Sequence, residues 1–179
     1  MEIRIGSHVA CICEGSAEQA IIENLLDNHL LVFEREQMID EDVLRCRDAK
    51  TFETRYLRKG FEESISVIRI LDSRRENFKL SKAYAHKVDV INVITAPEIE
   101  MLIIINEDKY KEYKKSGKKP SDFCKQDLKM KEVKSYAFVK SYFGNSDILI
   151  SAIKKYAELS KIQKGEYTLM DLLKKHIAP

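Results

Sequence analysis

Three short and largely apolar runs mark the chain and predict the strands of a sheet. They are HVACIC (8–13), ISVIRIL (65–71) and VDVINVI (88–94). Continuous apolar runs of this length are typical of strands that are buried on both faces, as in parallel sheets. The stretches between them are polar or follow helical spacing. The pattern therefore predicts an α/β fold in which helices flank a parallel sheet.

The segment EGSAEQAIIENLLDNHLL (14–31) follows the first run directly and predicts a tight turn and then a helix. Gly15 permits the turn, while Ser16 and Gln19 have the spacing of a capping box. Apolar residues then recur at helical spacing as far as Leu26. A strand, a turn and a helix in this order form the opening of a βα unit.

The rest of the pattern predicts mainly helices. We expect a short strand at 30–35, a surface helix at 48–63 and a helix or loop at 76–87. A helix should begin after Pro97 and extend to residue 116, followed by an exposed loop at 116–122. Two more helices are expected, at 146–161 with Asn145 or Ser146 as the cap, and at 168–177. The C-terminal part of the chain is thus expected to be helical.

Length and charge limit the choice of protein class. The 179 residues predict one domain with a real core. The net charge is only +2, so any affinity for nucleic acid must come from local clusters of charge. No apolar run approaches the roughly 20 residues that span a bilayer, and the N-terminal MEIRIG lacks the apolar core of a signal peptide. We therefore expect a cytoplasmic protein without a membrane partner.

The four cysteines do not form a recognisable zinc site. Cys11 and Cys13 lie close together inside an apolar run, and no second pair of Cys or His residues completes a set of ligands. Buried cysteines that act as small apolar side chains are the favoured interpretation.

Acidic residues follow each of the three predicted strands. Glu14 and Asp72 follow the first two directly, and Glu98 and Glu100 come shortly after the third. Ligands of open parallel sheets bind beyond the carboxyl ends of the strands, so we expect these side chains to share one edge. Clustered carboxylates repel unless a cation or a proton neutralises them. A hard divalent ion, Mg²⁺ or Mn²⁺, accounts for such a cluster. The alternative is that each acid is a solvated or helix-capping residue.

These residues resemble the pattern of the TOPRIM domain. The run Glu14-Gly15-Ser16-Ala17-Glu18, followed by Asp72 at the end of a later strand, is similar to the E-G-x-x-E and strand-end Asp of that family. The segment Pro97 to Glu100 resembles the P-x-x-E segment of RloB-like TOPRIM proteins. The resemblance covers about residues 7–105 and implies a TOPRIM-like Rossmannoid sheet in a single domain (1–179), with a basic and helical extension at about 106–179.

The resemblance also implies an activity. Proteins of this kind include the RloB-like and OLD-type nucleases of phage defence, so it implies a metal-dependent endonuclease that hydrolyses RNA or DNA. An ABC-type ATPase is the implied regulatory partner. Glu14, Asp72 and Glu100 are the implied metal ligands, and Glu18 or Glu100 would accept a proton from the attacking water or help to hold a second ion.

One position departs from the family pattern. The second acid of the usual D-x-D is replaced by Arg74. Either Glu76 or Glu100 supplies the missing carboxylate, or metal binding is weak, or the activity is lost; we expect Glu100. Arg74 or Arg75 could clamp a phosphate. The alternative function is a catalytically degenerate TOPRIM-like module that binds nucleic acid or a protein partner.

A basic segment follows the resemblance. Between residues 109 and 140 there are eleven lysines against four acidic residues, a balance of +7, with tyrosines and phenylalanines interleaved. Lysines neutralise phosphates and aromatic rings can stack on bases, so this segment is a candidate surface for nucleic acid; the alternative is a solvated face over core aromatics. The residues chosen as candidate contacts are Lys114, Lys115, Lys118 and Lys119.

Overall fold

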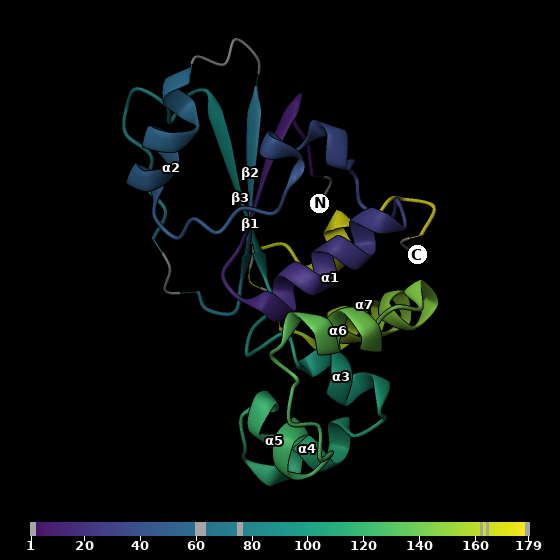
Figure 1. Cartoon of the computed structure of the whole chain (residues 1–179). Coiled ribbons are helices and arrows are strands. Elements are labelled where there is room, and N and C mark those ends of the chain that lie inside the picture. The colour runs from purple at the N-terminus through teal and green to yellow at the C-terminus, as the bar shows by residue number, and fades with distance from the viewer. Residues whose placement is uncertain (1–2, 60–63, 75–76, 162, 164, 178–179) are drawn as a thin grey trace.

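The fold is built around a short parallel sheet (Figure 1). The computed structural model describes residues 3–59, 64–74, 77–161, 163 and 165–177. The strands are β1 (His8–Cys13), β2 (Ile65–Leu71) and β3 (Val88–Ile94), in the order β1-β2-β3. Their bounds match the three apolar runs of the sequence, and the predicted α/β class is confirmed.

Helices and loops cover both faces of the sheet. Helix α1 (Ser16–Asp27) packs on the face that carries Cys11 and Ile68. Helix α2 (Ala49–Arg55) and the segment 77–87 cover the opposite face, where the Phe52 ring lies among the side chains of the sheet. Figure 1 shows the two helices on opposite sides of the strands. Alternate residues of each strand point to opposite faces, so β1 and β2 need apolar residues at almost every position.

The chain after β3 is helical, as predicted. The helices are α3 (Met101–Asn106), α4 (Tyr110–Ser116), α5 (Pro120–Gln126), α6 (Tyr136–Tyr142) and α7 (Ser146–Leu159). Helices α6 and α7 pack with α1 and α3 into the main core, whereas α4 and α5 lie at the end of the molecule remote from the sheet (Figure 1). The Asn145 side chain accepts a hydrogen bond from the Asp147 amide and caps α7, one of the two caps that the sequence offered.

Several predicted elements differ in detail. Gly15, not Ser16, is the N-cap of α1, and no side chain caps that helix; Arg45 instead donates hydrogen bonds to the Ser16 and Gln19 side chains. The predicted strand at 30–35 is wrong, because Leu31 forms only an isolated bridge with Leu173. The chain then turns through short 3₁₀ segments at Arg35–Gln37 and Ile39–Glu41.

Other helices are shorter than their patterns suggested. The helix expected after Pro97 begins only at Met101, and Asp108 with a φ of 53° separates it from α4. The predicted helix at 48–63 ends at Arg55 and is followed by a 3₁₀ turn, Leu57–Lys59. The predicted helix at 168–177 is a 3₁₀ turn at Leu169–Leu172. The predicted loop at 116–122 instead contains the start of α5.

Segments that are not strands form isolated bridges with both edges of the sheet. Beside β1, Met38 bridges Val9 and Leu44 bridges Ile12 in parallel direction. Beside β3, Tyr167 bridges Val93 in parallel direction, and its carbonyl oxygen accepts from the Ile94 amide at 2.7 Å. The segment 38–44 therefore runs beside β1, and the chain that follows Leu44 leads past the carboxyl end of the strand.

Two further expectations can be compared with the structure. All four cysteines are free thiols and buried, which confirms their interpretation as apolar side chains. Across the described residues, none of the helices combines the length and the apolar character needed to cross a membrane.

Candidate functional site

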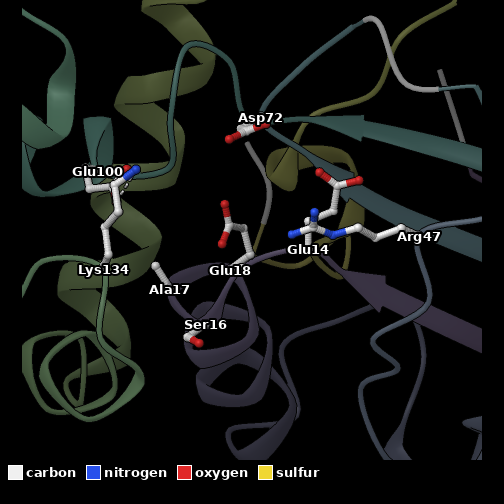
Figure 2. A pocket seen from close by; sticks show the side chains of 9 residues that line it. Glu14, Ser16, Ala17, Glu18, Arg47, Asp72, Glu100 and Lys134 are labelled. Atoms are coloured by element: carbon white, nitrogen blue, oxygen red, sulfur yellow. Dashed lines mark ion pairs between the residues drawn. The ribbon is translucent and has the colours of Figure 1, made fainter.

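A cavity of about 160 Å³ lies at the carboxyl edge of the sheet (Figure 2). Four carboxylates point into it or lie on its wall, together with two basic side chains. The lining residues are Glu14, Gly15, Ser16, Ala17, Glu18, Arg47, Asp72, Glu100 and Lys134. The structure thus brings together the four acids that the sequence singled out as catalytic candidates.

The register of the strands explains why Glu14 and Asp72 meet. Cys13, the last residue of β1, pairs with Ile70 of β2, so both strands end at nearly the same level. Glu14 and Asp72 are the first residues beyond these ends. The carboxylate of Glu14 is mostly shielded, with 16% of its side chain exposed, whereas Asp72 is exposed. The first of these groups is held by the fold and the second is free to meet a ligand.

Glu14 also faces a buried cation. The side chain of Arg69, in the middle of β2, is 1% exposed, and its Nη2 lies 3.9 Å from Oε1 of Glu14. Nη1 of Arg69 donates to Oδ1 of Asn92 at 3.5 Å, and the guanidinium lies 4.7 Å from the centre of the Phe78 ring. A buried charge is costly without an opposite charge nearby. Glu14 therefore serves the fold as well as the cavity.

Gly15 makes room for the carboxylate of Glu18. A Cβ atom at position 15 would overlap Oε2 of Glu18, while the extended backbone at Gly15 (φ −114°, ψ 164°) suits any residue. Glu18 lies in the first turn of α1 and is buried, and this burial raises the pKa of its carboxyl. The E-G-x-x-E spacing thus has a physical reason, since the glycine lets the second acid fold back toward the strand end.

The substitution Gly15→Ala should displace the Glu18 side chain without unfolding the protein. The obstructing atom is the end of a flexible side chain, so we expect a change in the free energy of unfolding within about 1 kcal/mol. Any activity that needs the Glu18 carboxylate should fall at least as far as in Glu18→Gln. Urea unfolding and the assays below would measure both effects. If Gly15→Ala keeps full activity while Glu18→Gln loses it, the displacement does not occur.

Glu100 reaches the cavity from the turn before α3. It is the N-cap of that helix and is 3% exposed. Burial raises the pKa of its carboxyl to about 7, even though Lys134 Nζ lies 4.0 Å away. Glu98 differs: its carboxylate accepts from the Ser121 amide at 2.8 Å and pairs with Lys134 at 3.3 Å. Against the effect of burial, these contacts lower the pKa of Glu98. Only Glu100 of the two lines the cavity.

The raised pKa of Glu100 should make stability depend on pH. Between about pH 4.5 and pH 7 the folded protein keeps a proton on Glu100 that the unfolded chain releases, so this group's contribution to stability falls as pH rises. One pKa unit corresponds to about 1.4 kcal/mol. Between pH 5 and pH 8, the free energy of unfolding of Glu100→Gln should rise relative to that of the native protein by up to about 3 kcal/mol. Urea unfolding with a chelator present would measure this difference.

Glu98→Gln is the matched control for this measurement. The pKa of Glu98 is lowered, so its contribution is present above the unfolded pKa and is lost only in more acidic solution. The difference in the free energy of unfolding between Glu98→Gln and the native protein should not change from pH 5 to pH 8. An equal pH dependence for both variants would contradict the assignment to Glu100.

The donor set of the cavity suits a hard cation in its chemistry. Carboxylate oxygens are the ligands that Mg²⁺ and Mn²⁺ prefer. Within the described residues, however, no three side chains of His, Cys, Asp or Glu converge closely enough to hold one ion. A shared ion would therefore require these carboxylates to lie closer together than they do in this structure.

Sequence reasoning missed two basic residues of the cavity. Arg47 enters from the side opposite Lys134 (Figure 2). It is brought there by the segment 38–44, which runs parallel to β1 and leads the following residues past the end of the strand. Lys134 comes from the loop before α6 and is one of the eleven lysines of the segment 109–140. No local motif marks either residue, because both depend on the path of distant chain.

The arginine proposed as a phosphate clamp is engaged elsewhere. Nε of Arg74 donates to Oε1 of Glu166 at 2.6 Å, and Nη2 donates to Oε2 at 3.0 Å. Arg74 is not among the residues that line the cavity. Arg75 and Glu76, the other two candidates of this loop, lie outside the described residues.

The predicted lysine surface lies apart from the cavity. Lys114 and Lys115 end α4, and Lys119 precedes α5; all three are exposed. Lys118 forms an ion pair with Asp127 at 2.6 Å. The aromatic residues of this segment pack against the main core, and Phe123 is 3% exposed. The structure therefore favours core packing over base stacking for these rings.

Comparisons of the chain with models of protein families, with curated proteins and with solved structures returned no match. What the structure establishes is an α/β fold with a three-stranded parallel sheet and a helical C-terminal part.

Proposed function

We propose that the protein is a TOPRIM-like, metal-dependent nuclease. The observation that carries the proposal is the cavity in which Glu14, Glu18, Asp72 and Glu100 gather from two strand ends, a helix and a turn. A parallel sheet places ligands at this edge. The E-G-x-x-E run and the strand-end Asp supply the same residues that the family resemblance names.

The residues of the cavity have distinct roles in this proposal. Asp72 and Glu14 would hold Mg²⁺ or Mn²⁺, with Glu100 as the third ligand in place of the acid that Arg74 replaces. Such an ion stabilises negative charge on a phosphate and lowers the pKa of a bound water. Glu18 is buried, and burial raises the pKa of its carboxyl, which makes the carboxylate a stronger base toward the bound water. Arg47 and Lys134 provide positive charge on the two flanks of the cavity.

The biological setting is proposed from the resemblance alone. A nuclease of this type would act on RNA or DNA as an effector of phage defence, under the control of an ABC-type ATPase partner. Divalent-dependent cleavage by the purified protein tests the enzymatic part. We expect labelled RNA or DNA to be cut with Mg²⁺ or Mn²⁺ and to stay intact with EDTA. Absence of cleavage for single-stranded and duplex forms of both polymers would contradict it.

A second candidate is a binding module without chemistry. It is supported by the two basic side chains in the cavity and by Arg74, which stands at the family's second acid and pairs with Glu166. In that case the protein would bind nucleic acid or a protein partner, and EDTA would leave its affinity unchanged. Binding without cleavage, unaffected by EDTA, would favour this alternative.

A further inference from the structure

A second basic surface adjoins the cavity and was not evident from the sequence. Residues 45–58 contain five basic and two acidic residues, and residues 77–87 contain three lysines and no acid, which gives a balance of +6. These two segments are far apart in sequence. We name the exposed side of residues 45–58, which include α2, together with segment 77–87 the α2 face.

The two segments of the α2 face are joined in the structure. The Phe52 and Phe78 rings lie 5.8 Å apart, and the Ser81 amide donates to a carboxylate oxygen of Glu53. The other acid, Asp48, caps α2 by accepting from the Thr51 amide. Both acids of this surface are therefore tied to backbone amides. With these two carboxylates counted, the net charge of the two segments is still +6.

The basic side chains of the α2 face are open to solvent. Arg45, Arg47, Lys50, Arg55, Lys79 and Lys82 are all exposed. Across the part of the chain that the structure describes, none of these six lies within 4.0 Å of a carboxylate in an ion pair. By contrast, the lysine-rich segment 109–140 contains several paired cations. They are Lys109 with Glu112, Lys118 with Asp127, Lys134 with Glu98 and Lys140 with Asp27.

The α2 face is continuous with the cavity through Arg47. This residue lines the cavity and precedes α2 by two positions, so Lys50 follows it within the first turn of the helix. Helix α2 and segment 77–87 then extend along one face of the sheet, away from the carboxyl edge (Figure 1). The lysines of α4 and α5 lie at the far end of the molecule instead.

We infer that the α2 face binds the phosphodiester backbone of a nucleic acid and directs it past Arg47 into the cavity. This inference rests on the proposed function and names the surface that holds its substrate. Exposed cations in a row release counterions when they meet a polyphosphate, which makes the affinity depend steeply on salt. A guanidinium at the mouth of the cavity can hold one phosphate with two hydrogen bonds.

Two matched variants of the full-length protein test the inference. The first is Arg47→Gln/Lys50→Gln/Lys79→Gln/Lys82→Gln on the α2 face. The second, Lys114→Gln/Lys115→Gln/Lys118→Gln/Lys119→Gln, removes the same charge from the last turn of α4 and the turn before α5, and is called the α4–α5 variant. Fluorescence anisotropy would measure binding of a labelled oligonucleotide, single-stranded and duplex, in EDTA so that no metal-dependent cleavage occurs.

The α2-face variant should bind at least tenfold more weakly at about 0.1 M salt. The slope of log affinity against log salt should fall by about 3, at roughly 0.7 to 0.9 for each lost phosphate contact. The α4–α5 variant should stay within threefold of the native protein. Both variants should show the native circular dichroism spectrum, because all the altered side chains except the half-buried Lys118 are exposed.

Other outcomes overturn the inference in distinguishable ways. Equal losses in both variants, or a larger loss in the α4–α5 variant, would move the substrate to the lysine-rich helices. If the native protein cleaves nucleic acid and the α2-face variant binds it normally, the proposed function stands and the α2 face is not the binding surface. If the variant loses only its binding to vesicles of phosphatidylglycerol, the face meets a membrane. Native protein that binds no oligonucleotide overturns the inference, and the cleavage assay then decides the proposed function.

Discussion

Asp72→Asn should abolish metal-dependent cleavage while leaving the fold intact. Asp72 is exposed at the end of β2, so the amide removes a charge without burying an unpaired group. Loss of an ion that supplies several kcal/mol of charge stabilisation lowers the rate by about a thousandfold or more, at 1.36 kcal/mol for each tenfold. The measurement is the initial rate of cleavage in Mg²⁺ and in Mn²⁺. Calorimetric titration with Mn²⁺ should show weakened binding of the ion.

Asp89→Asn is the matched control. Asp89 is also an exposed acid of the sheet, but it pairs with Ser66 near the amino end of the strands, opposite to the cavity. The cleavage rate of Asp89→Asn should stay within twofold of that of the native protein. Asp72 is a cleaner test than Glu14, because Glu14 also faces the buried Arg69 and its removal would disturb the sheet. Full activity of Asp72→Asn would exclude the proposed metal site.

Phe52→Ala should have the largest effect on stability. The Phe52 ring is 0% exposed and lies in one core cluster with Ile12 and Val67 of the sheet. It also contacts the Tyr56 and Phe78 rings, at centroid distances of 5.3 and 5.8 Å. Truncation of a buried Phe costs about 3–5 kcal/mol. Domains of this size are stable by only about 5–15 kcal/mol, so the midpoint of urea unfolding should fall sharply. The α2 face would lose its anchor at the same time.

Lys50→Ala on the same helix provides the comparison. Lys50 is exposed, so its truncation should change the free energy of unfolding by less than about 0.5 kcal/mol. If Phe52→Ala lowers the free energy of unfolding by less than about 1 kcal/mol, α2 contributes little to the packing of the sheet.

The strands could be predicted because their signal is local. In β1 and β2 the sheet is covered on both faces, so burial requires apolar residues along the whole run. Helix α7 could be predicted for a similar reason, since its apolar residues repeat at helical spacing and Asn145 supplies the cap. The strand expected at 30–35 failed because its pairing with residues 172–174 is limited to one bridge, after which the chain turns into a 3₁₀ segment at Arg35.

The acids and the bases of the cavity differ in how far the sequence reveals them. Glu14 and Asp72 follow strands directly, so topology alone puts them at one edge. Arg47 follows no strand, and its position depends on the bridge between Leu44 and Ile12. The engagement of Arg74 by Glu166 joins residues 92 positions apart, and no local pattern predicts such a contact.

The bridges at the two sides of the sheet have one more consequence. An open sheet normally presents rows of unpaired amides and carbonyls on its outer strands, which can recruit a strand from another molecule and start aggregation. Beside β1, amide–carbonyl bonds with Leu44 occupy positions at Cys11 and Cys13, and beside β3 Tyr167 does the same at Asn92 and Ile94. Segments that are not themselves strands thereby occupy part of each edge and leave fewer backbone groups to which a strand of another molecule could add.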